Sequence, residues 1–345
     1  MEKLLMLGTS YGTLLMLEYA KSQGVHTIVT DYLEPAHSPG KQVANEYWMI
    51  STGELDELEA RCREEGVTAV VCGISYVSNE WDLLKACNYA RSVSQSRKLV
   101  VERMLHGEEW YSVYALADGK VSMLALCAMY AQPGYPKFCY SITSTLSNHV
   151  EDFCRDINPA IEKVLQAVGC REGYAWTQAM LDEDGHFYIL EMGYRLDGDM
   201  MFVPFKELLG FDTVAWIVDY ARGLRNDPAA LPPSQEKAFA RVATSYMLWC
   251  NEKGGKIGAI EGLDEVKSWP GVVVDSLAAP GDPIRPYGPL GCILFTTDNA
   301  EEMFELIRKV NDTVRVTNTK GENVLIYYDD FDYLRRVYQE GLEGK

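Results

Sequence analysis

The sequence predicts an α/β protein that begins with a parallel sheet and continues into two units of mixed α+β structure. Over about the first 75 residues, short apolar runs alternate with helical stretches, the pattern of a parallel sheet covered by helices on both faces. Further along, apolar runs flank two Asp-Gly dipeptides, which favour β-hairpins. A chain of 345 residues can hold two or three domains, and we expect them at residues 1–88, 89–230 and 235–345.

The first unit is expected to alternate strands with helices. Strands are predicted at Leu4–Leu7, His26–Thr30, Tyr47–Ile50 and Val67–Cys72, and helices at Leu14–Ser22 and Glu54–Glu65. Ligands of parallel α/β sheets gather at the carboxyl ends of the strands. In this chain those ends are the loops Gly8–Gly12 and Gly73–Tyr76 and the residue Asp31.

The second and third units mix strands and helices less regularly. We expect a strand at Lys98–Glu102, a hairpin of Glu109–Leu116 with Val121–Cys127 around Asp118-Gly119, and helices at Asn158–Val168 and Thr213–Arg222. Residues 226–234 contain three prolines and are predicted to be a linker. The third unit should contain short strands and a helix at Asn299–Val310.

Composition restricts the class of protein and its partners. A hydrophobic content of 47% and a charged content of 24% are ordinary for a globular protein, and no apolar run approaches the roughly 20 residues of a membrane span. The formal net charge of −18 argues against nucleic acid or an anionic membrane as partner. Nine cysteines without a Cys-x-x-Cys pair suit a reducing compartment, so we expect a cytoplasmic protein with small-molecule partners.

The most informative segment is the second predicted hairpin, Trp176–Arg195, which surrounds Asp184-Gly185. If that dipeptide forms a two-residue type I′ turn, counting outward places Gln178 directly opposite Glu191 on one face. Directly opposed residues have Cβ atoms about 4.5–5.5 Å apart, so one cation could contact both side chains. The same count predicts a hairpin buried on both sides, with Met180, Phe187 and Ile189 on the face of Gln178 and with Leu181, Tyr188 and Leu190 on the other.

Two interpretations of Glu191 follow from the residues alone. In the first, Glu191 and Arg195 form a structural ion pair, because a buried carboxylate needs a partner. In the second, Gln178 and Glu191 are oxygen ligands of Mg²⁺, which proteins usually hold with one or two carboxylates plus substrate phosphates. Arg195 would then lie beside a transferred phosphoryl group, whose oxygens match the planar guanidinium.

Three segments together resemble the ATP-grasp superfamily of carboxylate–amine ligases, most closely its biotin carboxylase and carbamoyl phosphate synthetase large-subunit types. The N-terminal alternation is similar to the family's Rossmann-like pre-ATP-grasp domain. Leu99–Glu109 resembles its hinge strand, and Gln178–Arg195 resembles its metal hairpin. The resemblance implies a pre-ATP-grasp domain at 1–88, an ATP-grasp domain at 89–230 and a C-terminal domain at 235–345.

The resemblance also implies roles for residues around the nucleotide. Glu102, Arg103 and Leu105 would contact the adenine, and Glu109 would accept hydrogen bonds from the ribose hydroxyls. The alternative for Glu102 and Glu109 is that both are solvated loop acids.

At the phosphates, the resemblance implies that Gln178 and Glu191 hold Mg²⁺ and that Arg195 is the catalytic residue, because it would stabilise the phosphoryl group during transfer. An acid substrate would approach the two loops that follow the first and fourth strands, where helix amino ends favour anions. These loops contain the candidate substrate residues Gly8, Ser10, Tyr11 and Ser75. Many relatives are dimers, so a homodimer is the expected assembly.

The sequence departs from the family in two places. Gly193 stands where the family usually has a metal-binding Asn, and Asp197 is the residue that could compensate. Residues 79–106 contain no glycine and only Lys85 and Lys98, so the glycine-rich lid that normally covers the phosphates is missing. Either the lid is absent from the sequence as given, or the protein has lost it.

These observations predict an ATP- and Mg²⁺-dependent ligase that activates a carboxylate as an acyl phosphate for attack by an amine or another nucleophile. The alternative is a catalytically inactive relative that binds a small molecule or a protein, which the missing lid and Gly193 favour. A third interpretation, a nicotinamide-dependent oxidoreductase, depends on Gly8 and on Asp31 as a ribose-binding acid.

Overall fold

The computed structural model describes residues 2–7, 11–31, 34–35, 38–51, 54–67, 69–72, 105, 107–276 and 278–343. Within these residues the strands form a sheet of four strands, a sheet of eight strands and a sheet of three strands. The mixed α/β class predicted from the sequence is confirmed.

The four-stranded sheet is built from residues 3–72. Its elements are β1 (Lys3–Leu7), α1 (Tyr11–Ser22), β2 (His26–Thr30), α2 (Pro39–Val43), β3 (Glu46–Trp48), α3 (Leu55–Glu65) and β4 (Ala69–Cys72). The strands are parallel in the order β3-β2-β1-β4, which confirms the predicted alternation. Gly66 ends α3 in the left-handed conformation that glycine adopts most easily, with φ of 63°.

The eight-stranded sheet carries the candidate site. Its central segment consists of β5 (Gly107–Ala117), β6 (Lys120–Ala131), β7 (Tyr140–Ser144), α5 (Val150–Asp156), α6 (Asn158–Ala167), β8 (Gly173–Asp182), β9 (Phe187–Gly193), α7 (Phe202–Leu209), α8 (Thr213–Ala221) and the 3₁₀ turn η2 (Pro228–Ala230). The strand order is β12-β14-β10-β7-β6-β5-β8-β9, and every neighbouring pair is antiparallel.

The C-terminal third extends the same sheet. It contains β10 (Val242–Trp249), β11 (Gly255–Glu261), α9 (Leu263–Lys267), β12 (Val272–Asp275), β13 (Pro283–Ile284), β14 (Pro289–Thr297), α10 (Ala300–Thr313), β15 (Arg315–Asn318) and α11 (Phe331–Glu343). Because β10 pairs with β7, the strands on either side of residue 235 form one continuous ladder. The smaller sheet β13-β11-β15 is also C-terminal. The predicted limits of the three units stay a prediction.

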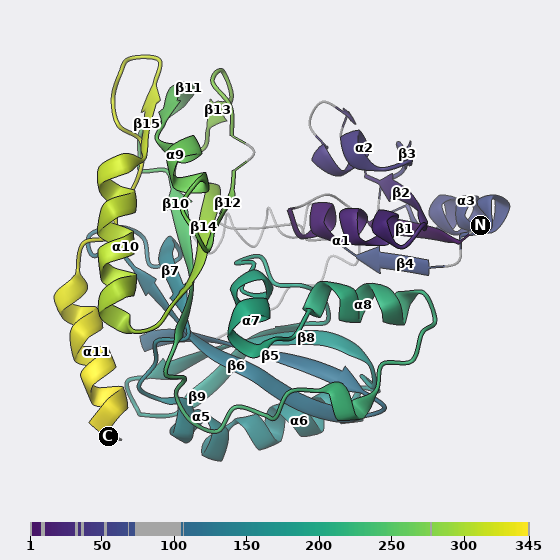
Figure 1. Cartoon of the computed structure of the whole chain (residues 1–345), viewed down its shortest axis with the longest axis horizontal. Coiled ribbons are helices and arrows are strands. Elements are labelled where there is room, and N and C mark those ends of the chain that lie inside the picture. The colour runs from purple at the N-terminus through teal and green to yellow at the C-terminus, as the bar shows by residue number, and fades with distance from the viewer. Residues whose placement is uncertain are drawn as a thin grey trace, which may run out of the picture.

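Helices cover both faces of the eight-stranded sheet (Figure 1). On the back face, named here for its contact with α5 and α6, the core includes Trp110 and Phe153. On the front face, which α7 and α8 cover, the core includes Trp176 and Phe202. Successive side chains of a strand point to opposite faces, so neighbours along β5 or β8 belong to different cores.

The N-terminal unit contacts the helices of the front face. The Tyr19 hydroxyl of α1 donates to Asp219 of α8 at 3.1 Å, and Arg222 pairs with Glu2 at 3.0 Å. The front-face core also contains Leu4 of β1. The four-stranded sheet therefore shares an apolar core with the front face, above which it lies in Figure 1.

Two further observations concern the environment of the protein. In the described part of the chain, no helix has both the length and the apolar character needed to cross a membrane. The seven cysteines with described side chains are all free thiols. The cytoplasmic location expected from the cysteines stays a prediction.

Candidate active site

Gln178 and Glu191 lie directly opposite each other, as predicted. Gln178 belongs to β8, and Glu191 belongs to β9, which is an edge strand of the sheet. Directly opposed side chains project from the same face. Because Trp176, two residues before Gln178, lies in the front-face core, the pair is on the front face.

The turn between β8 and β9 differs from the predicted type I′ turn. The amide of Asp182 donates to the carbonyl of His186 at 3.0 Å, so three residues rather than two form the loop. Gly185 has a positive φ of 78°, but Asp184 does not, although a type I′ turn requires it. Instead, the Asp184 carboxylate accepts hydrogen bonds from the His186 amide at 3.0 Å and from the Tyr188 hydroxyl at 2.7 Å. These bonds favour the longer loop.

A β-bulge at Leu190 compensates for the extra loop residue. Next to the turn, Met180 is opposite Tyr188, but the register shifts before Gln178 meets Glu191, and Leu190 has no partner. Without the bulge, Glu191 would project from the back face, because a shift of one residue turns every side chain over. The predicted pair is therefore confirmed, although the count from the turn missed two shifts that cancel.

The three-residue loop changes the predicted faces of the residues that lie between the turn and the bulge. Tyr188, and not Phe187 or Ile189, lies opposite Met180 on the front face. Phe187 and Ile189 pack against the back-face core, as Leu181 does. The prediction that the first two share the face of Gln178 is therefore wrong.

The predicted burial of the hairpin is wrong as well. Glu191 is exposed and Gln178 is half-buried, because β9 is an edge strand. Leu190, predicted to line a buried face, is 37% exposed. The pair therefore faces solvent in the described part of the chain and is open to a ligand.

Arg195 does not form the structural ion pair with Glu191 that one interpretation requires. Among the described residues its contacts are a hydrogen bond to the carbonyl of Leu196 at 3.0 Å and the ring of Trp176, whose centre lies 4.8 Å from the guanidinium carbon. Trp176 is opposite Gly193. A Cβ at Gly193 would lie 2.3 Å from Cε2 of Trp176, so the indole occupies the space of a side chain at that position.

Strand β5 places Glu109 beside the pair. Glu109 is opposite Met180, which is two residues from Gln178 on the front face of β8. Gly107 begins β5 because the strands approach closely there: a Cβ would lie 1.9 Å from the carbonyl oxygen of Leu181. The structure thus brings together Glu109, Gln178 and Glu191, which the sequence analysis selected from segments far apart in the chain.

The loop after β9 adds a carboxylate that the sequence analysis missed. Asp199 accepts a hydrogen bond from the Thr143 hydroxyl at 2.8 Å. Asp197, considered as a metal ligand, is 3% exposed and accepts hydrogen bonds from the Tyr174 hydroxyl at 2.7 Å and the Met201 amide at 2.8 Å. Both Asp197 oxygens thus already have donors. The sequence signal that could have identified Asp199 is the run Asp197-Gly198-Asp199, which follows soon after Arg195.

The carboxylates of the front face repel one another. Burial, together with smaller contributions from the nearby charges of Asp199 and Glu191, raises the pKa of Glu109 to about 7. Burial also raises the pKa of Asp199 to about 6, with an opposing contribution from the Thr143 hydrogen bond and a smaller increase from Asp197. These directions indicate negative charge that a bound cation would stabilise.

The donors on the front face fit Mg²⁺ in kind. Gln178 and Glu191 offer the oxygen ligands that a hard cation prefers, and the charge of Glu109 and Asp199 adds to its attraction. In the described ranges, no three His, Cys, Asp or Glu side chains converge closely enough to hold a metal ion.

Of the remaining predicted site residues, two lie within the described ranges and five lie outside them. Leu105 is half-buried just before β5, and Tyr11 begins α1. Of the segment predicted to lack a lid, 79–106, the structure describes Leu105 alone. The candidate residues outside the described ranges are Gly8, Ser10, Ser75, Glu102 and Arg103. Their roles, and the absence of the lid, stay predictions.

Asp31 does not offer the carboxylate that the nicotinamide interpretation requires. One of its oxygens lies 2.9 Å from Nζ of Lys41, and the other accepts a hydrogen bond from Ser38 at 2.8 Å. Asp31 is 5% exposed and Lys41 is 4% exposed. The Asp at the end of β2 is therefore part of a buried ion pair, which accounts for it without a ribose.

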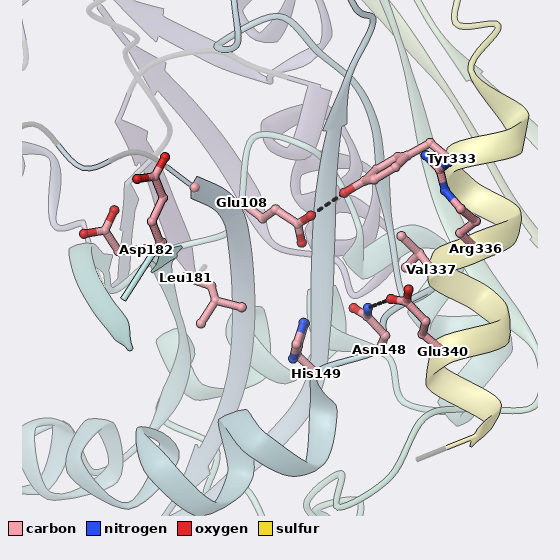
Figure 2. A pocket seen from close by; sticks show the side chains of 11 residues that line it. Glu108, Asn148, His149, Leu181, Asp182, Tyr333, Arg336, Val337 and Glu340 are labelled. Carbon is pink, nitrogen blue, oxygen red and sulfur yellow. Dashed lines mark hydrogen bonds between the residues drawn. The ribbon is translucent and has the colours of Figure 1, made fainter. Parts of the chain in front are cut away.

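A cavity of about 310 Å³ opens on the back face where β5 begins (Figure 2). Its lining includes Glu108, which accepts a hydrogen bond from the Tyr333 hydroxyl of α11, and His149, whose ring meets Trp110 edge-on at 5.5 Å. Glu108 and Glu109 are neighbours in a strand and point to opposite faces. This cavity is therefore separate from the candidate site.

No protein-family model and no curated protein matches this sequence. Solved structures do match. An L-amino acid ligase from Bacillus licheniformis is 16% identical, with 92% of this chain and 99% of that chain covered and a TM-score of 0.69. A phosphoribosylglycinamide synthetase from Anaerococcus prevotii is 15% identical, with 92% and 100% covered and a TM-score of 0.69.

A third structure contains nucleotide. The biotin carboxylase domain of 2-oxoglutarate carboxylase from Hydrogenobacter thermophilus, in complex with MgADP, ADP and bicarbonate, is 13% identical. The match covers 94% of this chain and 91% of that chain, with a TM-score of 0.65. At these identities the likeness shows the fold. This chain has the fold of the ATP-grasp carboxylate–amine ligases.

Proposed function

We propose that the protein is an ATP- and Mg²⁺-dependent ligase that activates a carboxylate as an acyl phosphate for attack by an amine or another nucleophile. The observation that carries this proposal is the pairing of Gln178 with Glu191 on the front face, beside Glu109 and Asp199. These are oxygen ligands and acidic groups gathered around an exposed position. A divalent cation matches this arrangement, and nucleotide phosphates would bind through that cation.

Each residue has a distinct part in the proposed site. Gln178 and Glu191 would hold Mg²⁺, which supplies charge neutralisation and orientation for the phosphates. Glu109 lies on the neighbouring strand, within the electrostatic influence of Glu191, and its carboxylate would accept hydrogen bonds from the ribose hydroxyls. Glu102, Arg103 and Leu105 precede β5 directly in the chain, where the adenine would lie.

Arg195 is the proposed catalytic residue. Its guanidinium makes no ion pair with a described acid, and its planar donors match the oxygens of a transferring phosphoryl group. In the proposed reaction a substrate carboxylate oxygen bonds to the terminal phosphorus as ADP leaves. The nucleophile then attacks the acyl carbon, phosphate leaves, and an amine loses its proton. The carboxylate would enter past Gly8, Ser10, Tyr11 and Ser75, at the carboxyl ends of β1 and β4.

The named relatives support the substrate classes. One solved structure of this fold is called an L-amino acid ligase, and another contains MgADP with bicarbonate, a small carboxylate-like anion. We therefore propose a small carboxylic acid and an amine as substrates and ATP with Mg²⁺ as cosubstrate and cofactor. A homodimer stays a prediction, which the mass measured by light scattering would test.

Thermal unfolding in the presence of nucleotides tests the proposal. MgADP and MgATP should raise the melting temperature of the wild type, NAD should not, and removal of Mg²⁺ should abolish the rise. Glu191→Gln should lose the Mg²⁺-dependent part of the rise in melting temperature. Glu183→Gln is the matched control, because Glu183 is an exposed acid in the loop of the same hairpin, and it should respond like the wild type. A wild type that responds to neither adenine nucleotide contradicts the proposal.

A second candidate function is a catalytically inactive protein of this fold that binds a small molecule or another protein. Gly193 favours it, because the position beside the metal pair carries no ligand and is filled by Trp176. The nucleotide titration together with an assay of phosphate release distinguishes the two functions. Binding of MgATP followed by phosphate release with a carboxylate and an amine supports the ligase, whereas binding without turnover across a panel of acids and amines supports the inactive relative.

A further inference from the structure

Trp176 is a buried aromatic residue beside the Gln178–Glu191 pair. It lies on the front face of β8, two residues from Gln178, and it is 5% exposed. Its indole Nε1 has no hydrogen-bond partner in the described structure. A buried donor without a partner costs free energy, so this nitrogen offsets part of the stability that the buried ring contributes.

The indole closes one side of the metal pair. A Cβ at Gly193 would lie 2.3 Å from Cε2 and 2.5 Å from Nε1 of Trp176, so position 193 tolerates no side chain while the indole is present. On the other side of the pair stand Met180 and Tyr188, whose hydroxyl already donates to Asp184. Neither flank offers a carboxylate from β8 or β9.

The same indole holds Arg195. The guanidinium carbon lies 4.8 Å from the ring centre, within the range of a cation–π contact. Among the described residues, the other contact of this guanidinium is the carbonyl of Leu196, one residue away. This hydrogen bond restricts the direction of the guanidinium less than a ring of fixed orientation does. Trp176 itself is fixed, because Tyr111 packs against it with ring centres 5.9 Å apart.

We propose that Trp176 is a positioning residue of the nucleotide site, which aims Arg195 at the terminal phosphate and limits the Gln178–Glu191 pair to a single divalent cation. The guanidinium then supplies the positive charge that a second cation would otherwise supply at the phosphates. This inference rests on the proposed function, because it assumes that nucleotide phosphates bind at the pair.

Two binding measurements on the purified protein test it. The first is Mn²⁺ titration in the presence of ADP, followed by electron paramagnetic resonance, which should give one bound ion per chain in the wild type. The second is calorimetric affinity for Mg²⁺ with ADP and with a non-hydrolysable ATP analogue. Trp176→Phe weakens the cation–π contact, so it should lower the affinity for the triphosphate by about fivefold while the affinity for ADP changes by less than about twofold.

Trp110→Phe is the matched control. Trp110 is 1% exposed, also has an indole Nε1 without a partner, and lies on the back face of the neighbouring strand. Trp110→Phe removes the same kind of buried indole as Trp176→Phe does, but it should leave both nucleotide affinities unchanged. If Trp176→Phe fails to fold, Arg195→Lys takes its place, because it keeps the charge but loses the planar stacking surface. Arg195→Lys should likewise lower the affinity for the triphosphate more than the affinity for ADP.

The outcomes separate this inference from the proposed function. Two Mn²⁺ ions per wild-type chain, or equal losses for ADP and the triphosphate in Trp176→Phe, overturn the inference and leave the ligase standing. A wild type that binds neither nucleotide overturns both.

Discussion

Replacement of Glu109 by Gln should stabilise the protein at pH 8 and weaken nucleotide binding. Burial, with Asp199 and Glu191 nearby, raises the pKa of Glu109 from the usual 4.5 to about 7. At 1.36 kcal/mol per pH unit, this difference corresponds to about 3 kcal/mol of cost for the charged form in the folded state. Glu109 is half-buried and solvent screens part of that cost, so we expect a gain of about 1–3 kcal/mol.

The pH dependence gives the sign of the effect. The folded protein binds the Glu109 proton more tightly than the unfolded chain does, so this group's stabilisation is fully present below pH 4.5 and is lost as pH rises through about 7. Glu109→Gln removes this dependence, so its advantage over the wild type should be larger at pH 8 than at pH 5.5.

Urea denaturation of the apoprotein at both pH values measures the free energy of unfolding. Glu183→Gln, which changes an exposed acid in the hairpin loop, is the control and should match the wild type at both. An equal effect of Glu109→Gln at the two pH values, or a loss of stability at pH 8, would refute the argument that the front-face carboxylates strain the folded protein. With added MgADP the wild type should become more stable than Glu109→Gln, because the bound ligand raises the free energy of unfolding of the wild type by more than that of the variant.

Three other predictions concern single contacts, each checked by urea denaturation against the wild type. Gly193→Ala should destabilise the fold by about 2 kcal/mol, because its Cβ would lie 2.3 Å from the Trp176 ring, and an unchanged midpoint would contradict that geometry. Lys41→Met should cost about 3–5 kcal/mol, because it leaves Asp31 buried without its cation; a loss below about 1 kcal/mol would mean that the pair is not buried in solution. Asp184→Ala should cost about 1–2 kcal/mol, because the His186 amide and the Tyr188 hydroxyl lose their acceptor, whereas Asp184→Asn should recover most of it.

Local sequence signals predicted those parts of the fold that local forces determine. The alternation of apolar runs gave the parallel sheet, with β2 at His26–Thr30 as predicted. The first Asp-Gly dipeptide forms the expected two-residue turn, with φ of 46° at Asp118 and 80° at Gly119 and with Ala117 opposite Lys120. The second does not, because a tyrosine hydroxyl four residues on holds the Asp184 carboxylate.

The candidate site was predicted only in part, because some of its residues carry local sequence patterns and others do not. Gln178, Glu191 and Glu109 carry recognisable patterns along the chain, and the structure brings them to one face. Asp199 and Trp176 were missed because their importance comes from packing between distant segments: Asp199 bonds to Thr143 of β7, and Trp176 stacks with Arg195. The bulge at Leu190 depends on the whole sheet, so no count along the hairpin could locate it.

The central claim is that one amide and one carboxylate, facing each other across β8 and β9, jointly bind the metal of a metal–nucleotide complex. Anomalous diffraction from crystals of the protein with Mn²⁺ and ADP locates the ion directly. We predict a peak at roughly 2.2 Å from side-chain oxygens of both Gln178 and Glu191, with phosphate oxygens completing the coordination. A peak elsewhere, or nucleotide bound on the back face, would contradict the account.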